Sequence, residues 1–341
     1  MKTRKKLSYN GLLLLITVLL FITLYAVACI LYGHNGFSHL QTFLNILIDK
    51  AGLICITCGM TCVMLTGGID ISVGSLVAMN CMLLVNSMRN GANCYLVCLE
   101  VLLIGILFGI VQGWLVSYMK IQPFIVTMAG MSFARGMTAV INTRQISITQ
   151  ADNPVFYSWA NAKIYLPAAL GYTNKKGKVM VPFIYPAVIV ALVCVVVIFL
   201  FLRYTRTGRG FYAIGGNETS AGMMGLNTRK TKMKAYVLCS FLTAVGSICF
   251  CLNSMQGSVQ QAMGLEMDAI ASAVIGGTLL TGGVGNVFGS LVGVLINGTI
   301  AAAVKSNGKL LSSWANIVTA ALLCFFIVLQ SVFAYLKRRS K

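Results

Sequence analysis

Ten apolar runs constrain this 341-residue chain more than any other feature of its sequence. Lipid offers no water to backbone N–H and C=O groups, so a run of about 18 or more apolar residues is typical of a membrane-spanning helix. Only 10% of the residues are charged, whereas a soluble domain carries roughly a quarter. The sequence therefore predicts an all-α polytopic membrane protein whose ten transmembrane helices cover residues 11–32, 41–65, 74–88, 94–118, 123–141, 182–202, 235–253, 268–281, 287–304 and 313–335.

The distribution of basic residues predicts how these helices are oriented. Lys and Arg cluster at residues 2–6, 203–234 and 337–341, and basic residues beside spans mark cytoplasmic loops. Because an even number of spans places both termini on one side, we expect both termini and the 203–234 loop in the cytoplasm. Residues 142–181 then form the external loop of a single transmembrane domain covering residues 1–341. Despite a net charge of +19, no basic stripe is interleaved with aromatic residues outside the spans, so we expect no nucleic-acid partner.

Two glycine-rich segments in the two halves of the chain resemble one another. LTGGIDISVGSLV (65–77) and LTGGVGNVFGSLV (280–292) share eight of thirteen positions. Paired glycine breaks in apolar segments point to the central pathway of a transporter. Two alternatives to a repeat stay open. The match could arise by chance, because Gly, Leu and Val are common in this chain, or the two segments could be unrelated tight turns between spans. The predicted repeat leaves the symmetry between the halves undecided.

The few charged residues near the spans are candidates for function. A carboxylate within a membrane is costly and defaults to a functional role, and Asp70 lies in the first glycine break. Asp268 either caps the helix that follows it or contacts a solute. Arg135 falls inside the fifth span, so we expect it to find a polar partner or to extend toward the membrane surface.

Motifs for catalysis and nucleotide binding are missing from the sequence. No G-x-x-x-x-G-K-[ST] phosphate loop occurs, because Gly177-Lys178 and Gly308-Lys309 are not followed by Ser or Thr. No nucleophile, base or metal constellation is recognisable either. We therefore expect no catalytic residue, no metal site and no cofactor on this chain, and any ATP that drives transport must be hydrolysed by another subunit.

The 203–234 segment is predicted to contain a short helix. Asn217 can cap a helix that starts at Glu218, and Gly225 can end it. Such a helix between basic flanks could dock into a groove of a soluble partner. The alternative is a solvated basic loop that only sets the topology.

Four longer stretches resemble the permeases of carbohydrate ABC importers. Among these permeases the likeness is nearest to the ribose-type branch, and within that branch to the galactofuranose-type permease. The four stretches are GMTCVMLTGGIDISVGSLVAMN (59–80), QPFIVTMAGMSFARG (122–136), YAIGGNETSAGMMGLNT (212–228) and LEMDAIASAVIGGTLLTGGVGNVFGSLVGVLING (265–298). The resemblance runs from about residue 40 to residue 335. It implies a permease in a bacterial cytoplasmic (inner) membrane for a galactofuranose- or ribose-type monosaccharide.

The resemblance also implies partners and roles for particular residues. The partners are an ATPase subunit that holds ATP and Mg, a second permease (another copy or a paralogue) and an external sugar-binding protein. The loop before the seventh span is the coupling element in the family, which maps to Asn217, Glu218, Ala221 and Gly225. The resemblance and the glycine pattern together give the candidate pathway and gate residues Gly67, Gly68, Asp70, Ser72, Gly74, Gly276, Gly277, Gly282 and Gly283. An ion-coupled secondary transporter of a small polar solute, with Asp70 as the coupling charge, is the alternative.

Overall fold

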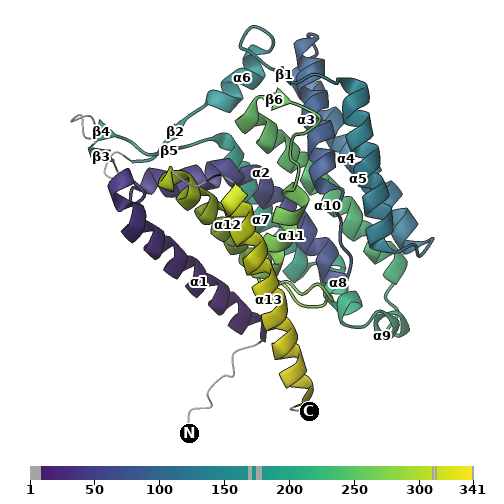
Figure 1. Cartoon of the computed structure of the whole chain (residues 1–341). Helices are drawn as coiled ribbons and strands as arrows, with labels where there is room; N and C mark the ends of the chain where they lie inside the picture. Colours follow the sequence, from purple (N-terminus) through teal and green to yellow (C-terminus); the bar gives the residue numbers. More distant parts are fainter. Residues whose placement is uncertain (1–8, 168–170, 174–178, 309–310, 312, 340–341) are drawn as a thin grey trace.

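The structure is a computed structural model that describes residues 9–167, 171–173, 179–308, 311 and 313–339. The described chain is predominantly helical (Figure 1). Its helices are α1 (Tyr9–Tyr32), η1 (Gly33–Asn35), α2 (Leu40–Leu65), α3 (Val73–Arg89), α4 (Cys94–Ser117), α5 (Pro123–Ile141), α6 (Pro154–Asn161), α7 (Pro186–Tyr204), α8 (Arg206–Gly216), α9 (Glu218–Met223), α10 (Thr228–Ser254), α11 (Leu265–Ile275), α12 (Val287–Asn307) and α13 (Ser313–Arg339).

Three short antiparallel strand pairs complete the secondary structure. β1 (Ile146–Ser147) pairs with β6 (Gln256–Gly257), β2 (Ile164–Tyr165) with β5 (Phe183–Ile184), and β3 (Tyr172–Thr173) with β4 (Val179–Met180). Together with α6, five of these strands lie in the segment between α5 and α7, which was predicted to be the large external loop. In Figure 1 this segment lies at the top and left, while α8, α9, the start of α1 and the end of α13 lie toward the bottom.

Each of the ten predicted spans coincides with a helix, which confirms the all-α polytopic fold. Within the described residues, eight helices are long and apolar enough to cross a membrane, and α3 is a shorter apolar helix. The segment predicted at 268–281 differs, because α11 has only 11 residues. At 1.5 Å per residue it is roughly 16 Å long, about half of a bilayer's hydrocarbon core. Its early end follows from Gly277, whose φ of +89° stops the helix.

The centre of the molecule is formed by α2 and α10. Every residue of α2 from Ala51 to Leu65 is buried, which is the pattern of a helix that is surrounded on all sides. Small residues bring the two antiparallel helices together: a Cβ on Gly52 would lie 2.9 Å from the Gly246 carbonyl oxygen, and one on Gly59 would lie 2.9 Å from the Cys239 Cα. Glycine at such crossings allows backbones to approach closely.

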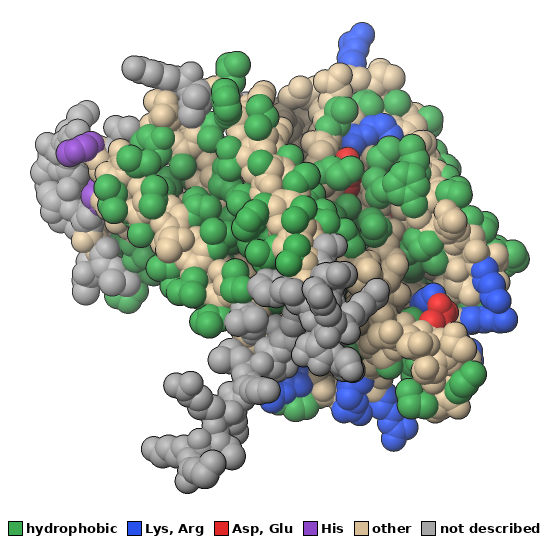
Figure 2. All heavy atoms as spheres, turned by 60° about the horizontal axis from the view of Figure 1, so that its bottom comes forward, with side chains coloured by type: hydrophobic (Ala, Val, Ile, Leu, Met, Phe, Trp, Pro, Cys, Tyr) green, Lys and Arg blue, Asp and Glu red, His purple; other side chains and the backbone are tan. Residues whose placement is uncertain are grey.

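The outer surface is apolar in its middle and basic at one end. Large hydrophobic side chains on α1, α4, α5 and α7 are exposed, as expected of helices that face lipid. Figure 2 shows hydrophobic side chains over much of this face, with Lys and Arg side chains at its lower centre and lower right and a few more near its top. The view brings the bottom of Figure 1 forward, so the lower group of basic side chains lies on the side of α8 and α9.

One segment between α10 and α11 turns back into the helix bundle. After β6, residues 258–264 lead to the start of α11, where Glu266 and the Ala262 carbonyl lie against Gly74 of α3. Arg135 holds this segment, since its Nη1 donates to the carbonyl oxygens of Val259 (2.6 Å) and Gln261 (2.8 Å). The predicted polar partner of Arg135 is therefore the backbone of this turn.

Candidate functional site

The first glycine break connects α2 to α3 through residues 66–72. At its start Thr66 Oγ1 donates to the Val63 carbonyl at 2.8 Å, and the N–H of Gly68 donates to the same oxygen at 3.2 Å. Between them Gly67 has a φ of +79°. This is the hydrogen-bond pattern of a helix that ends on a left-handed residue, a position that favours glycine.

The second break connects α11 to α12 through residues 276–286, and it differs from the first in detail. Gly277 rather than Gly282 ends the helix, because the N–H of Thr278 donates to the Ala273 carbonyl at 3.0 Å. The LTGG motif of this half forms a separate turn, closed by a 3.0 Å hydrogen bond from the Leu279 N–H to the Val284 carbonyl. The two GSLV motifs therefore lie in equivalent places at the start of α3 and α12, but the two LTGG motifs do not. The second connection has eleven residues, against seven in the first.

Although they are not equivalent, the two breaks lie in direct contact. The N–H of Gly283 donates to the Leu65 carbonyl at 3.0 Å, and a Cβ on Gly282 would lie 2.7 Å from the Gly67 nitrogen. A third segment joins them: a Cβ on Gly215, in the last turn of α8, would overlap both the Leu65 oxygen and the Gly283 nitrogen. We call Gly67, Gly215, Gly282 and Gly283 the glycine junction.

The α8 helix is capped at its start and bonded to the second break near its end. The Thr205 side chain accepts a hydrogen bond from the Gly208 N–H at 3.0 Å and so caps the start of the helix. Near its end the Tyr212 hydroxyl donates to the Gly285 carbonyl at 3.2 Å. Burial raises the pKa of Tyr212 to about 12, so its hydroxyl remains a proton donor at neutral pH. The second break is therefore bonded to α8 as well as packed against it.

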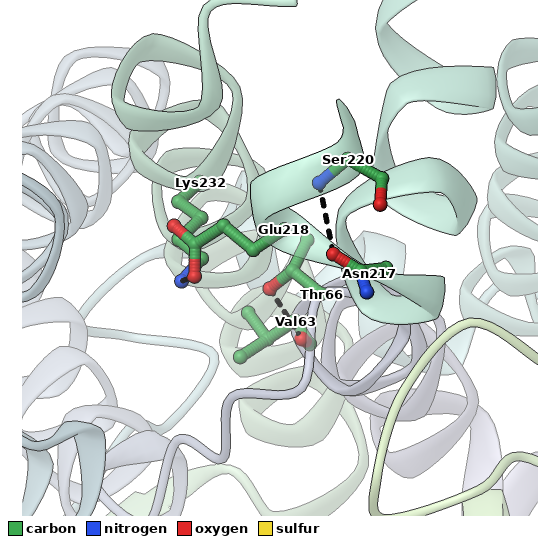
Figure 3. Close-up of polar contacts among 6 residues, drawn as sticks. All are labelled: Val63, Thr66, Asn217, Glu218, Ser220 and Lys232. Carbon is green, nitrogen blue, oxygen red and sulfur yellow. Dashed lines mark hydrogen bonds and ion pairs between the residues drawn. The ribbon is translucent and has the colours of Figure 1, made fainter. Parts of the chain in front are cut away.

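The helix predicted after Asn217 is present as α9. The Asn217 side chain accepts from the Ser220 N–H at 2.8 Å, and Glu218 pairs with Lys232 of α10 at 2.6 Å (Figure 3). At the other end Gly225 has a φ of +83° and its N–H donates to Gly222 at 3.0 Å. Ala221 is buried, whereas most other residues of α9 are exposed. The predicted cap, start and end of this helix are confirmed.

Asp70 and Ser72 form a buried polar network beside the junction. Asp70 Oδ1 accepts from both the N–H (3.0 Å) and the hydroxyl (2.5 Å) of Ser72, and Gln112 of α4 donates to the same hydroxyl oxygen at 2.9 Å. Both side chains are fully buried. Among the described N–H and O–H groups, none donates to Asp70 Oδ2, although the Cys239 thiol interacts with the same carboxyl group.

Two of the predicted glycines lie apart from both groups. A Cβ on Gly276 would overlap the backbone of Gly289 in α12, and one on Gly277 would lie 3.1 Å from Leu13 of α1. The remaining two are Gly68 and Gly74. A Cβ added to Gly68 would lie 2.5 Å from the Tyr236 hydroxyl, and Gly74 is in contact with Glu266. The predicted pathway residues are thus distributed over several contacts, of which only Gly67, Gly282 and Gly283 meet at the junction.

The structure excludes one of the two roles left open for Asp268, and it adds two residues of α8 that the sequence did not single out. Asp268 does not cap α11, since Gly264 holds the cap position and the carboxylate instead accepts from Asn297 of α12 at 3.1 Å. Gly215 and Tyr212 were not singled out as functional residues. The only sequence signal for them is the Gly215-Gly216 pair in YAIGGNETSAG, whose contact with both breaks depends on the tertiary fold.

Comparison with known proteins identifies the family of the chain. Residues 42–327 match the family described as branched-chain amino acid transport system / permease component. The inner membrane ABC transporter permease protein YjfF of Escherichia coli (strain K12) is 39% identical over 297 residues, covering 86% of this chain and 85% of that protein.

Two further relatives are named for sugars. The fructose import permease protein FruG of Bifidobacterium longum is 35% identical over 325 residues, 95% of this chain and 92% of that protein. The ribose import permease protein RbsC of Haemophilus influenzae is 34% identical over 296 residues, covering 86% of this chain and 85% of that protein. No solved structure matches the chain.

Proposed function

Because the chain belongs to the branched-chain amino acid transport system / permease component family, we propose that it is the membrane-spanning subunit of an ATP-driven sugar importer. Two of its relatives are named as import permeases for fructose and ribose, which supports a simple sugar as the cargo. Within that class we propose a monosaccharide of the galactofuranose or ribose type. The amino acid in the family's description makes a branched-chain amino acid the appropriate control substrate.

The proposed assembly contains three kinds of partner. ABC ATPase subunits bind ATP and Mg at the cytoplasmic face, and a second permease, identical or paralogous, completes the pathway. An external sugar-binding protein delivers the cargo. The relatives are permease subunits of bacterial ABC systems, which supports a multi-pass location in the bacterial inner membrane, with both termini in the cytoplasm.

The observation that carries the proposal is the contact between α8 and both glycine breaks. In this mechanism α9, with Asn217, Glu218, Ala221 and Gly225, contacts the ATPase. Displacement of α9 by the ATPase moves α8, and Gly215 transmits that movement to Leu65 and Gly283 by direct backbone contact. An ATPase drives transport only if its ATP-bound form favours one permease conformation over another, and this contact supplies a route for that preference.

The candidate gate is the glycine junction together with the polar network of Asp70 and Ser72. In the proposed mechanism, opening of the gate separates Gly283 from Leu65 and breaks their 3.0 Å hydrogen bond. Gly68, Gly74, Gly276 and Gly277 act in this scheme as close-packing positions around the gate. The ion-coupled alternative has no support among the relatives, since YjfF is named as an ABC transporter permease.

The test is uptake into proteoliposomes that contain the permease with its co-purified ATPase and second permease. Labelled ribose, galactofuranose and fructose are supplied with the external binding protein, and leucine serves as the control. We expect uptake of ribose or galactofuranose that requires ATP and survives ionophores that collapse ion gradients. Uptake by this chain alone, driven by an ion gradient, would refute the proposal, and uptake of leucine only would refute the sugar assignment.

A further inference from the structure

A groove on the lipid-facing surface lies outside the machinery described above. It is bounded by α4, α7, α8 and α10, and it encloses about 690 Å³. Its apolar wall includes Ile106 of α4 and Val237, Leu238 and Phe241 of α10. The groove opens at the end of the molecule where α8 and α9 lie.

Polar groups occur at one end of this groove only. Tyr118 directly follows the last residue of α4, Thr207 is in the first turn of α8, and Lys230 and Lys234 are in the first two turns of α10. Tyrosine and lysine with these surroundings are typical of the boundary between lipid headgroups and acyl chains. The polar end therefore marks the membrane surface, and the apolar end points toward the membrane centre.

The length of the groove corresponds to one leaflet. Lys230 and Phe241 are eleven positions apart in the same helix, which is roughly 16 Å at 1.5 Å per residue. Half of a bilayer's hydrocarbon core is about 15 Å. A single acyl chain that follows α10 from Lys230 to Phe241 therefore ends near the membrane centre.

The charge at the polar end is positive and is not neutralised by the chain itself. Lys230 and Lys234 are exposed and four positions apart, so they lie on the same face of α10. Among the described residues that line the groove none is acidic. In the part of the chain that the structure describes, the one ion pair within 4.0 Å joins Glu218 to Lys232, and Lys232 does not line the groove.

We propose that this groove binds an anionic phospholipid. Its phosphate lies between the ammonium groups of Lys230 and Lys234 with the Thr207 hydroxyl as a further donor, and one acyl chain lies along Val237, Leu238 and Phe241. Lysine near a headgroup contributes a factor of about five per residue in favour of an anionic lipid. Two lysines therefore give a preference of about 25-fold for phosphatidylglycerol over phosphatidylcholine.

The test is native mass spectrometry of the detergent-purified full chain, titrated with phosphatidylglycerol or phosphatidylcholine of identical acyl chains. We expect the double variant K230Q/K234Q to lose at least tenfold in phosphatidylglycerol affinity. The matched control is R209Q/R229Q, which removes the same charge from exposed residues that do not line the groove. This control is expected to change the affinity less than twofold.

A second variant tests the acyl-chain part separately. Val237→Trp fills the groove and leaves both lysines in place, so we expect it to reduce the binding of both lipids. Thermal unfolding of each variant shows that it is folded. Equal affinity of the wild type for the two lipids, equal loss in K230Q/K234Q and in the arginine control, or displacement of the lipid by inorganic phosphate alone would each overturn the proposal.

Discussion

Replacing Gly215 with alanine tests whether α8 transmits movement to the glycine breaks. The added Cβ would overlap the Leu65 carbonyl oxygen and the Gly283 nitrogen, and it would lie 2.9 Å from the carbonyl carbon of Gly282. All three are backbone atoms, so none can rotate away as a side chain does. Either α8 withdraws from the junction, or the 3.0 Å hydrogen bond between Gly283 and Leu65 breaks.

The size of the effect follows from either outcome. Overpacking of a close contact costs about 1–3 kcal/mol, and leaving one buried donor or acceptor without its partner costs a similar amount. In one arrangement of the permease α8 contacts both breaks. A penalty of about 2 kcal/mol on this arrangement lowers its population about thirtyfold relative to arrangements without the contact. We therefore expect the amount of sugar imported per ATP hydrolysed to fall at least tenfold.

The neighbouring glycine provides a matched control for this experiment. A Cβ on Gly216 would meet no atom within 4 Å, so Gly216→Ala makes the same chemical change in the same turn of α8 without the clash. Both variants are reconstituted with the ATPase and second permease, and uptake and ATP hydrolysis are measured together with thermal unfolding of the purified permease. If Gly215→Ala and Gly216→Ala couple equally well, the argument that α8 acts through this contact is wrong.

Three further perturbations address the other parts of the site. Glu218→Lys combined with Gly225→Asp should abolish ATPase stimulation by the permease while the chain still inserts. The chain tolerates the change at Glu218 because this side chain is 51% exposed, and an exposed ion pair contributes less than about 1 kcal/mol to stability. Unchanged uptake would contradict a coupling role. Arg135→Gln should lower the free energy of unfolding by about 2–4 kcal/mol, since it weakens two charge-assisted hydrogen bonds to the turn at 258–264. Arg135→Lys should recover part of the lost stability, as measured by thermal unfolding. Asp70→Asn should keep ATP-driven uptake within about threefold, because an amide oxygen can still accept both hydrogen bonds from Ser72. Uptake that an ion gradient drives in the wild type and does not drive in Asp70→Asn would instead support the secondary transporter.

The elements that could be predicted from the sequence are those with local causes. Long apolar runs must be helical in lipid, so nine of the ten predicted spans coincide with apolar helices, while the tenth, at 268–281, is helical only as far as Ile275. The α9 helix was predicted at both ends, because Asn217 and Gly225 act on backbone groups within three residues of themselves. Neither prediction needed knowledge of how distant segments pack.

The repeat shows where this reasoning fails. Eight shared positions made the two glycine-rich segments a candidate repeat, yet one LTGG motif ends α2 and the other forms an additional turn after α11. The hydrogen bonds that end α2 at Gly67 and α11 at Gly277 show that these two glycines are equivalent. Sequence identity instead aligns Gly67 with Gly282. The role of Gly215 was also out of reach, because its contact joins residues that are far apart in the chain and depends on how α8 docks.

The unequal length of the two breaks makes the two halves of the permease mechanically different. The second connection has four more residues than the first, which is about 14 Å of additional contour length. In this structure the additional length is folded into the turn between Leu279 and Val284. A displacement that would stretch the short connection beyond its reach can be absorbed in the long one by opening that turn. The half containing α2 and α3 therefore behaves as the stiff member, and the half containing α11 and α12 as the compliant one.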